Sequence, residues 1–405
     1  MPHVAIFGGG VSGLTTAMEL AERGFEVTVY ERQHWGGKVR STEVPGTGVA
    51  GRHNLPLEHG FHFFPTFYRH LPATMSRIPT SGGRFVADNL VPGSRELITR
   101  ATAPPIVMPS RLPRTLREWR TMLMSLFQLG AGVPERELRF FMSRMLQFMA
   151  MCPERREAQL DQISWWDYVG AQGRSNEYQK LIARMPSQLL LAVPAARVSA
   201  RTIGHAFMGM VDSGLTPGGN IDRNLNAPPR ESWVGPWVRW LGKRVKLVLG
   251  ATLEGFEVDS RRSQIAAAKV RVDGMRTRVV ADSYVCALPV EVARRMWTPE
   301  LVGLDPALRR LDALSLTWMC GVQLFLSTPR PIEHGHVAHS DTAWALTSVS
   351  QAQFWEAFVF ASHGDGRVRD LVSVIIGDWD TPGSECVHKC ARDCSEEELV
   401  RELVA

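Results

Sequence analysis

Three glycines near the amino terminus have the spacing of a phosphate-binding turn. Gly8, Gly10 and Gly13 follow the pattern G-x-G-x-x-G, with Ser12 inside it. In a strand–turn–helix unit the first glycine allows a tight turn and the second lets the backbone approach a pyrophosphate. The third lets the helix pack closely on the strand. Because the amino end of such a helix offers unpaired N–H groups to phosphates, the spacing predicts a dinucleotide site that includes Ser12.

The segments around these glycines match that unit. Residues 3–7 form an apolar run typical of a strand buried on both faces, and residues 14–23 predict a helix ended by Gly24. Residues 25–30 predict a second strand, with Glu31 at its carboxyl end. A carboxylate there accepts hydrogen bonds from the adenosine ribose and repels a 2′-phosphate, which disfavours NADP. The alternative is a glycine-rich turn that holds no ligand.

A second glycine pair with basic neighbours follows the acid: Arg32, Gly36, Gly37, Lys38 and Arg40. Bare main chain and positive charge can wrap the far side of a pyrophosphate. This arrangement resembles the flavin amine oxidase superfamily, in which a GGR-type motif closely follows the acidic residue. Lys38 replaces the usual arginine, which keeps the charge and loses the bidentate fork.

The segment PLEHGFHFFPTFY, residues 56–68, resembles a stretch that passes near the flavin ring in the phytoene desaturase branch of that superfamily. Weaker similarities begin at residues 163, 222, 281 and 344, and together they resemble a carotenoid- or squalene-type desaturase. The resemblance implies FAD as the cofactor. It also implies flavin contacts at Gly60, Phe61 and His62, and a main-chain contact to adenine at Leu253.

The resemblance implies an α/β fold in which a Rossmann-type FAD-binding domain, similar to that of glutathione reductase, is interleaved with a substrate domain. The expected FAD-binding domain comprises residues 1–75 and 226–300. The expected substrate domain, a mixed sheet with helices, comprises residues 76–225 and 301–405. A chain of 405 residues is long for a single core, which also favours two domains.

Members of this superfamily close the FAD site with a carboxyl-terminal segment that we do not find before the last residues, SEEELVRELVA. The Gly-Asp of GDWDTPG, residues 377–383, instead resembles an earlier strand of the substrate domain. We expect one of three explanations: the chain is truncated, a partner chain completes the site, or the dinucleotide site is vestigial and no longer binds its cofactor.

Residues 110–150 predict two basic amphipathic helices. Leucines and Trp119 form one stripe in the first helix, and a second stripe comprises Leu138, Phe141, Met142, Met145, Leu146 and Met149. Two interpretations are open. The helices could contact a membrane interface peripherally, or they could cover the substrate cavity and expose their arginines to solvent.

The composition is that of an ordinary folded protein, with a diffuse net charge of +5 that does not favour nucleic-acid binding. Met1 runs straight into the first strand, and no apolar run of 18 residues is present, so neither a signal peptide nor a spanning helix is predicted. Six cysteines without a disulfide framework favour a reduced, cytoplasmic location.

Glu58, His59 and His62 are the candidates for proton handling beside a flavin, although histidines satisfied within a tight turn explain them equally well. Cys386, Cys390 and Cys394 would share one face of a helix. Their spacing matches no common zinc or iron–sulfur pattern, so no metal is predicted.

These features predict a FAD-dependent oxidoreductase that dehydrogenates a long apolar isoprenoid by hydride transfer to flavin. One alternative is a flavin amine oxidase with an aromatic cage around its amine. Another is a flavin-free carrier of prenyl lipids on the same fold.

Overall fold

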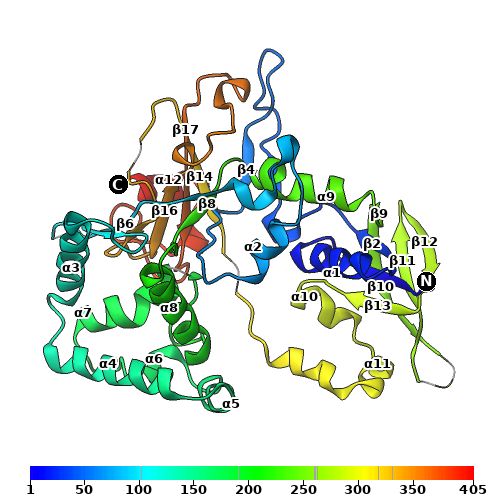
Figure 1. The fold of residues 1–405 in the computed structure, drawn as a ribbon, viewed down its shortest axis with the longest axis horizontal. Helices are drawn as coiled ribbons and strands as arrows, with labels where there is room; N and C mark the ends of the chain where they lie inside the picture. Colours follow the sequence, from blue (N-terminus) through cyan, green and yellow to red (C-terminus); the bar gives the residue numbers. More distant parts are fainter. Residues whose placement is uncertain (102, 190, 260, 262, 318, 331) are drawn as a thin grey trace.

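The computed structural model describes residues 1–405 apart from residues 102, 190, 260, 262, 318 and 331. The amino terminus lies in one lobe and the carboxyl terminus in another, and the chain crosses between the lobes repeatedly (Figure 1). The lobe with the amino terminus is built on a parallel sheet, and the other combines a mixed sheet with most of the helices.

The parallel sheet contains strands from both segments of the predicted FAD-binding domain, residues 1–75 and residues 226–300. Their order is β13 (Ser283–Cys286), β1 (His3–Phe7), β2 (Glu26–Glu31) and β9 (Lys246–Leu249). Between β1 and β2 runs α1 (Val11–Glu22), which begins three residues earlier than predicted. It does so because the glycine turn itself forms the first helical turn, with Leu14 N–H donating to Gly10 O at 2.9 Å.

Alternation along β1 buries both of its faces. Val4 and Ile6 pack against α1 and against α9 (Gly235–Leu241), whereas Ala5 and Phe7 pack on the opposite side. That side is covered by an antiparallel sheet of β10 (Ala251–Val258), β11 (Ile265–Val272) and β12 (Met275–Val279). The expectations of a doubly buried first strand and of a later hairpin are confirmed.

The mixed sheet joins segments from distant parts of the chain. Its order is β14 (Gly321–Leu326), β17 (Asp370–Ile376), β16 (Leu346–Ser350), β15 (Val337–His339), β6 (Arg95–Thr99) and β7 (Ile106–Pro109). Only the β15–β6 pairing is parallel among the described strands of this sheet. One face of β17 packs on α12 (Glu396–Val404), and the other carries Ser373 and Ile375 toward the segment 58–62.

The helical region between β7 and β8 (Arg223–Leu225) has its own core around Phe141, Phe148 and Trp165. Its α-helices are α3 (Leu116–Gly130), α4 (Glu135–Ala150), α5 (Pro153–Arg155), α6 (Trp165–Tyr168), α7 (Asn176–Tyr178) and α8 (Ala200–Leu215). Turns of π-helix at Arg156–Leu160 and Gln179–Leu189 continue α5 and α7. The helical character predicted for residues 163–215 is confirmed.

Smaller elements complete the fold. Two short antiparallel ladders pair β3 (Ser41–Glu43) with β4 (Pro56–Glu58) and β5 (Leu90–Pro92) with β8. The remaining α-helices are α2 (His70–Met75), α10 (Val290–Ala293) and α11 (Pro299–Leu304). In the described part of the chain, no helix is both long and apolar enough to cross a bilayer.

The packing of α1 on β1 generates a stability prediction. A methyl group at position 13 would lie 1.9 Å from Gly8 O, so Gly13→Ala should lower the free energy of unfolding by about 1–3 kcal/mol in chemical denaturation. The matched control is Gly303→Ala in α11, where nothing lies within 4 Å of the added carbon and stability should be kept or raised. Equal destabilisation of the two variants would contradict the close packing.

Candidate functional site

A cavity of about 660 Å³ opens at the carboxyl ends of β1 and β2. This is the position at which ligands bind in open α/β sheets. Nine of the sequence-predicted cofactor residues line it: Gly8, Gly10, Ser12, Glu31, Arg32, Gly36, Gly37, Lys38 and Leu253. The structure therefore brings together residues from the first turn, the second glycine pair and the returning strand β10.

Glycines form much of the cavity wall because the backbone segments approach one another closely. Gly8 has φ +109°, and a Cβ there would lie 2.5 Å from Ala287 O. Gly36 N–H donates to Gly9 O at 2.8 Å, which holds the second glycine pair against the first turn. Among the described residues no side chain caps the amino end of α1 at Gly10. The unpaired main-chain N–H groups of that end can therefore donate to a ligand or to water. Gly13 lies behind this wall and permits the packing of α1.

Glu31 stands at the end of β2 and is tied to two main-chain donors. Its Oε2 accepts from Gly9 N–H at 2.7 Å, and its Oε1 accepts from Gln33 N–H at 2.8 Å. A carboxylate has about four lone-pair positions, so capacity remains for further donors from within the cavity. The position suits hydroxyl groups of a ligand.

The two basic side chains after the second glycine pair differ in their surroundings. The side chain of Lys38 is 77% exposed and lies 3.6 Å from Glu291 in an ion pair. Arg40 also lines the cavity and donates from one terminal nitrogen to Gly37 O at 2.9 Å. Its Nε is buried and has no hydrogen-bond partner in the described chain. The sequence drew attention to Lys38, but the buried donor that lacks a partner belongs to Arg40.

The segment Glu58–His62 does not line this cavity: Glu58, His59, Gly60, Phe61 and His62 lie against the mixed sheet instead. Glu58 N–H donates to Gln323 Oε1 at 3.1 Å, and a Cβ on Gly321 would lie 2.7 Å from His59 O. His59 is nevertheless close enough for the charge of Arg40 to act on it. Burial, followed by that charge, lowers the pKa of His59.

Glu58 and His62 are buried and both favour their neutral forms. Burial raises the pKa of Glu58 to about 8, against a hydrogen bond from Ser41 that acts in the opposite direction. Burial and the neighbouring His59 lower the pKa of His62 to about 4. His62 Nδ1 and Glu58 Oε2 are 3.9 Å apart. Near neutral pH this contact therefore joins a protonated acid to a neutral imidazole, and it is not an ion pair.

A second cavity, of about 550 Å³, begins beside the same segment. Its lining is largely aromatic and apolar, and comprises Phe63, Phe67, Tyr68, Leu191, Arg201, Thr202, His205, Ala206 and Met210. Burial lowers the pKa of His205 and raises that of Tyr68, so both side chains favour their neutral forms. An apolar ligand could occupy this space between α8 and the segment 63–68.

The stripe of α3 faces away from the protein. Its apolar side chains are exposed, including Leu116 at 89% and Leu123 at 60%, and the adjoining Phe127 is 74% exposed. The helix is anchored through the buried Ser125, whose hydroxyl donates to Val107 O. Since nine residues turn a helix by about two and a half turns, Ser125 and Leu116 lie on opposite sides. In α4 the predicted stripe is split: Phe141 and Met145 are buried, whereas Met142, Leu146 and Met149 are exposed.

The carboxyl-terminal cysteines do not share a helical face. Cys390 and Cys394 flank a 3₁₀ turn at Ala391–Asp393, and α12 begins only at Glu396. The premise that a helix would gather the three thiols is therefore wrong. A capping box formed by Ser395 and Glu398 explains the later start, because it begins α12 after the last cysteine.

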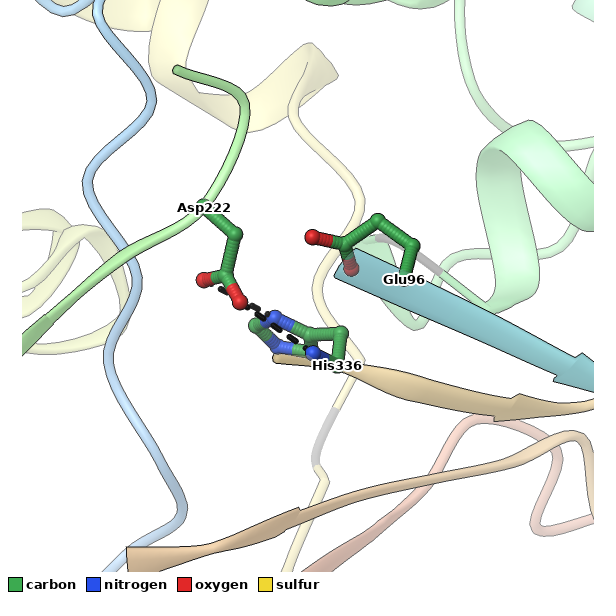
Figure 2. Close-up of side chains that lie close together, drawn as sticks. All are labelled: Glu96, Asp222 and His336. Atoms are coloured by element: carbon green, nitrogen blue, oxygen red, sulfur yellow. Dashed lines mark hydrogen bonds and ion pairs between the residues drawn. The ribbon is translucent and has the colours of Figure 1, made fainter. Parts of the chain in front are cut away.

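Sequence reasoning missed a cluster of Glu96, Asp222 and His336, shown in Figure 2. Burial and the charge of Asp222 raise the pKa of Glu96 to about 8. Burial opposes charge on His336, but Asp222 and Glu96 raise its pKa above the ordinary value. More than a hundred residues separate each member from the next, so no local spacing could have revealed the group.

Comparisons with known proteins agree with this architecture. The family described as flavin containing amine oxidoreductase matches residues 11–396. A carotenoid phi-ring synthase of Chlorobaculum tepidum is 42% identical over 65 residues, which are 16% of this chain and 9% of the relative. A zeta-carotene desaturase of Arabidopsis thaliana is 37% identical over 87 residues, 21% of this chain and 14% of the relative. The matched segments thus span a small part of those relatives.

Among solved structures, wild-type putrescine oxidase with bound putrescine superposes with a TM-score of 0.61. The alignment covers 100% of this chain and 80% of the oxidase at 17% identity, a likeness that concerns the fold. The match along almost the whole sequence, together with the glycine-walled cavity at the ends of β1 and β2, leads to one conclusion. The chain belongs to the family of flavin-containing amine oxidoreductases.

Proposed function

We propose that this protein is a FAD-dependent oxidoreductase that dehydrogenates a long apolar isoprenoid of the carotenoid type. The observation that carries the proposal is the cavity at the ends of β1 and β2, which is lined by glycine main chain, Glu31 and Arg40. The names of the carotenoid phi-ring synthase and zeta-carotene desaturase that it resembles support this substrate class.

The residues present fit an anionic dinucleotide. Gly8, Gly10 and Gly36 leave room for phosphates beside the uncapped end of α1, and Arg40 supplies a buried cationic donor. Glu31 would hold the ribose hydroxyls, and the wall at Leu253 would adjoin the adenine. When bound, the flavin supplies the redox chemistry as a hydride acceptor.

The chain itself would orient the substrate and manage a proton. The cavity lined by Phe63, Phe67 and Leu191 is suited to an apolar chain because burying such a ligand there removes apolar surface from water. Near pH 7 Glu58 carries a proton and His62 does not. Because a pKa of about 4 makes His62 a weak base, we assign Glu58 and His62 together as an uncharged pair that would pass a proton on and would not retain it on the imidazole.

We further propose that α3 rests on an anionic membrane surface, from which a lipid-soluble substrate could enter. Its exposed apolar stripe has basic neighbours, since Arg114, Arg117 and Arg120 are all exposed. An apolar face flanked by arginines is the pattern of helices that lie in the interface of anionic bilayers.

An amine oxidase is the second candidate, because putrescine oxidase shares the fold over the whole chain. Anaerobic mixing distinguishes the candidates: the flavin absorption of the loaded protein should be bleached by a carotenoid-type polyene and unaffected by an alkyl diamine. The reverse result would favour the amine oxidase. A purified protein that takes up no flavin at all would exclude both.

The first prediction here concerns cofactor affinity. Glu31→Gln removes the negative charge at the end of β2 and should weaken FAD binding by about 10- to 100-fold, because hydrogen bonds to charged groups contribute about 1.5–3 kcal/mol. Glu26→Gln, an exposed position on the same strand, should bind FAD like the wild type. Titration of apoprotein with FAD measures both, and equal affinities would contradict the assignment of Glu31.

The second prediction concerns pH. The pKa of Glu58 is near 4.5 in the unfolded chain but about 8 in the folded protein, so the folded state retains a proton that the unfolded chain releases. Wild-type stability should therefore fall, relative to Glu58→Gln, by about 1.4 kcal/mol per pH unit between about pH 5 and 8. Denaturant titrations at several pH values give this difference. Parallel curves for the two proteins would show that the folded acid is not held protonated.

The third prediction concerns the membrane. Phe127→Glu should reduce co-sedimentation with vesicles of anionic phospholipid about tenfold or more, since it removes an apolar side chain that the bilayer would bury and adds a charge of the same sign as the lipid. Met275→Glu on β12 is the matched control, because Met275 is equally exposed but lies on the other lobe. Equal sedimentation of the two variants would contradict membrane contact by α3. So would a wild-type protein that covers α3 by forming a dimer and does not sediment with vesicles.

A further inference from the structure

Three segments that are distant in sequence bring Glu96, Asp222 and His336 together. Glu96 lies on β6, Asp222 immediately precedes β8, and His336 immediately precedes β15. One potential ligand atom from each lies within 4.8 Å of the others. Figure 2 shows the carboxyl group of Glu96 directed toward the space shared by Asp222 and the imidazole.

The members are held in place by other contacts. Asp222 is 1% exposed, and its Oδ2 accepts from His336 N–H at 3.1 Å. Ser110 Oγ donates to Glu96 Oε1 at 2.6 Å. The His336 ring meets Phe61 and Phe63 edge-on, with centroid distances of 4.4 and 5.0 Å. Groups outside the cluster hold Glu96 and His336, and the main-chain N–H of His336 holds Asp222, so the arrangement is preorganised.

The spacing is compatible with a shared cation. His336 Nδ1 and Asp222 Oδ1 form an ion pair at 3.1 Å, a separation that two ligands of one metal can also have. Two ligands that each lie about 2.0–2.2 Å from a metal are separated by about 3.0–3.5 Å when they are adjacent in its coordination sphere. A divalent cation at this point would take the place of the ion pair between His336 and Asp222 and would be bound by the deprotonated side chains.

A neighbouring amide provides an independent indication. Asn224 is 1% exposed, and its Nδ2 donates to Asp222 Oδ1 at 2.8 Å, so its amide lies at the cluster. Its Oδ1 is buried and has no hydrogen-bond partner within the described residues. Such an oxygen is costly to bury without a partner, and it is a ligand type that cations accept.

We propose that Glu96, Asp222 and His336, with Asn224 beside them, form a binding site for a first-row divalent transition-metal ion. Carboxylate oxygens with one imidazole favour Mn²⁺ or Zn²⁺, whereas Mg²⁺ and Ca²⁺ prefer sites made only of oxygen. The ion would join β6, β8 and β15 and press His336 against Phe61 and Phe63. Its role is therefore structural, at the junction between the mixed sheet and the segment 58–64.

Mn²⁺ is the more decisive probe because six free cysteines could bind Zn²⁺ elsewhere. Full-length protein stripped with a chelator should bind one equivalent of Mn²⁺, seen as loss of the free-ion electron paramagnetic resonance signal, and should gain thermal stability. Mg²⁺ at the same concentration should leave the melting temperature unchanged. Absence of Mn²⁺ binding by the folded wild type would overturn the proposal, whatever the behaviour of any variant.

Variants locate the site. His336→Gln and Glu96→Gln should each weaken Mn²⁺ binding by about 100-fold or more, since loss of an outer-sphere partner alone costs 10- to 100-fold. The matched control is His334→Gln, two residues from the cluster and with its ring tilted against Phe354, which should bind Mn²⁺ as the wild type does. Unchanged Mn²⁺ affinity in folded His336→Gln would also overturn the assignment.

Discussion

The close approach of the first turn to its helix is the constraint on which the amino-terminal lobe depends. A single added carbon at Gly13 would meet Gly8 O at 1.9 Å, and one at Gly8 would meet Ala287 O at 2.5 Å. The absence of side chains there lets α1 lie on β1 and lets β13 run alongside it. Because these glycines have no side chains, main-chain atoms also line the cavity. The glycines thus permit both the close packing of α1 and the approach of a ligand.

The mixed sheet has a comparable role for the segment 58–64. Its outer face is apolar and packs on α12, whereas its inner face presents Gln323 and Ser373. Gln323 on that face accepts a hydrogen bond from Glu58 N–H, and burial against the sheet keeps both Glu58 and His62 uncharged near neutral pH. The chemistry available to these side chains is thus decided by the sheet beneath them.

The two lobes differ in how fully their apolar faces are covered by other elements. In the amino-terminal lobe the parallel sheet is covered on both faces, by α1 and α9 and by the antiparallel sheet. In the other lobe α3 is held by little more than β7 and shows its apolar stripe to solvent. Exposed apolar surface on this scale is costly for a water-soluble helix and is typical of a surface that meets another phase or molecule.

The sequence by itself determined the parts of the protein that follow local rules. The glycine spacing, the alternation in β1 and the position of Glu31 predicted the first βαβ unit, because backbone sterics and side-chain periodicity act over a few residues. The same rules found both amphipathic helices. They could not tell which way the stripe of α3 would face, since that depends on what packs against Ser125. They could not distinguish Arg40 from Lys38, because an unpaired buried donor exists only after the chain has folded around it. The meeting of Glu96, Asp222 and His336 was decided by the tertiary structure alone, since it requires the pairing of strands from segments that no sequence pattern connects.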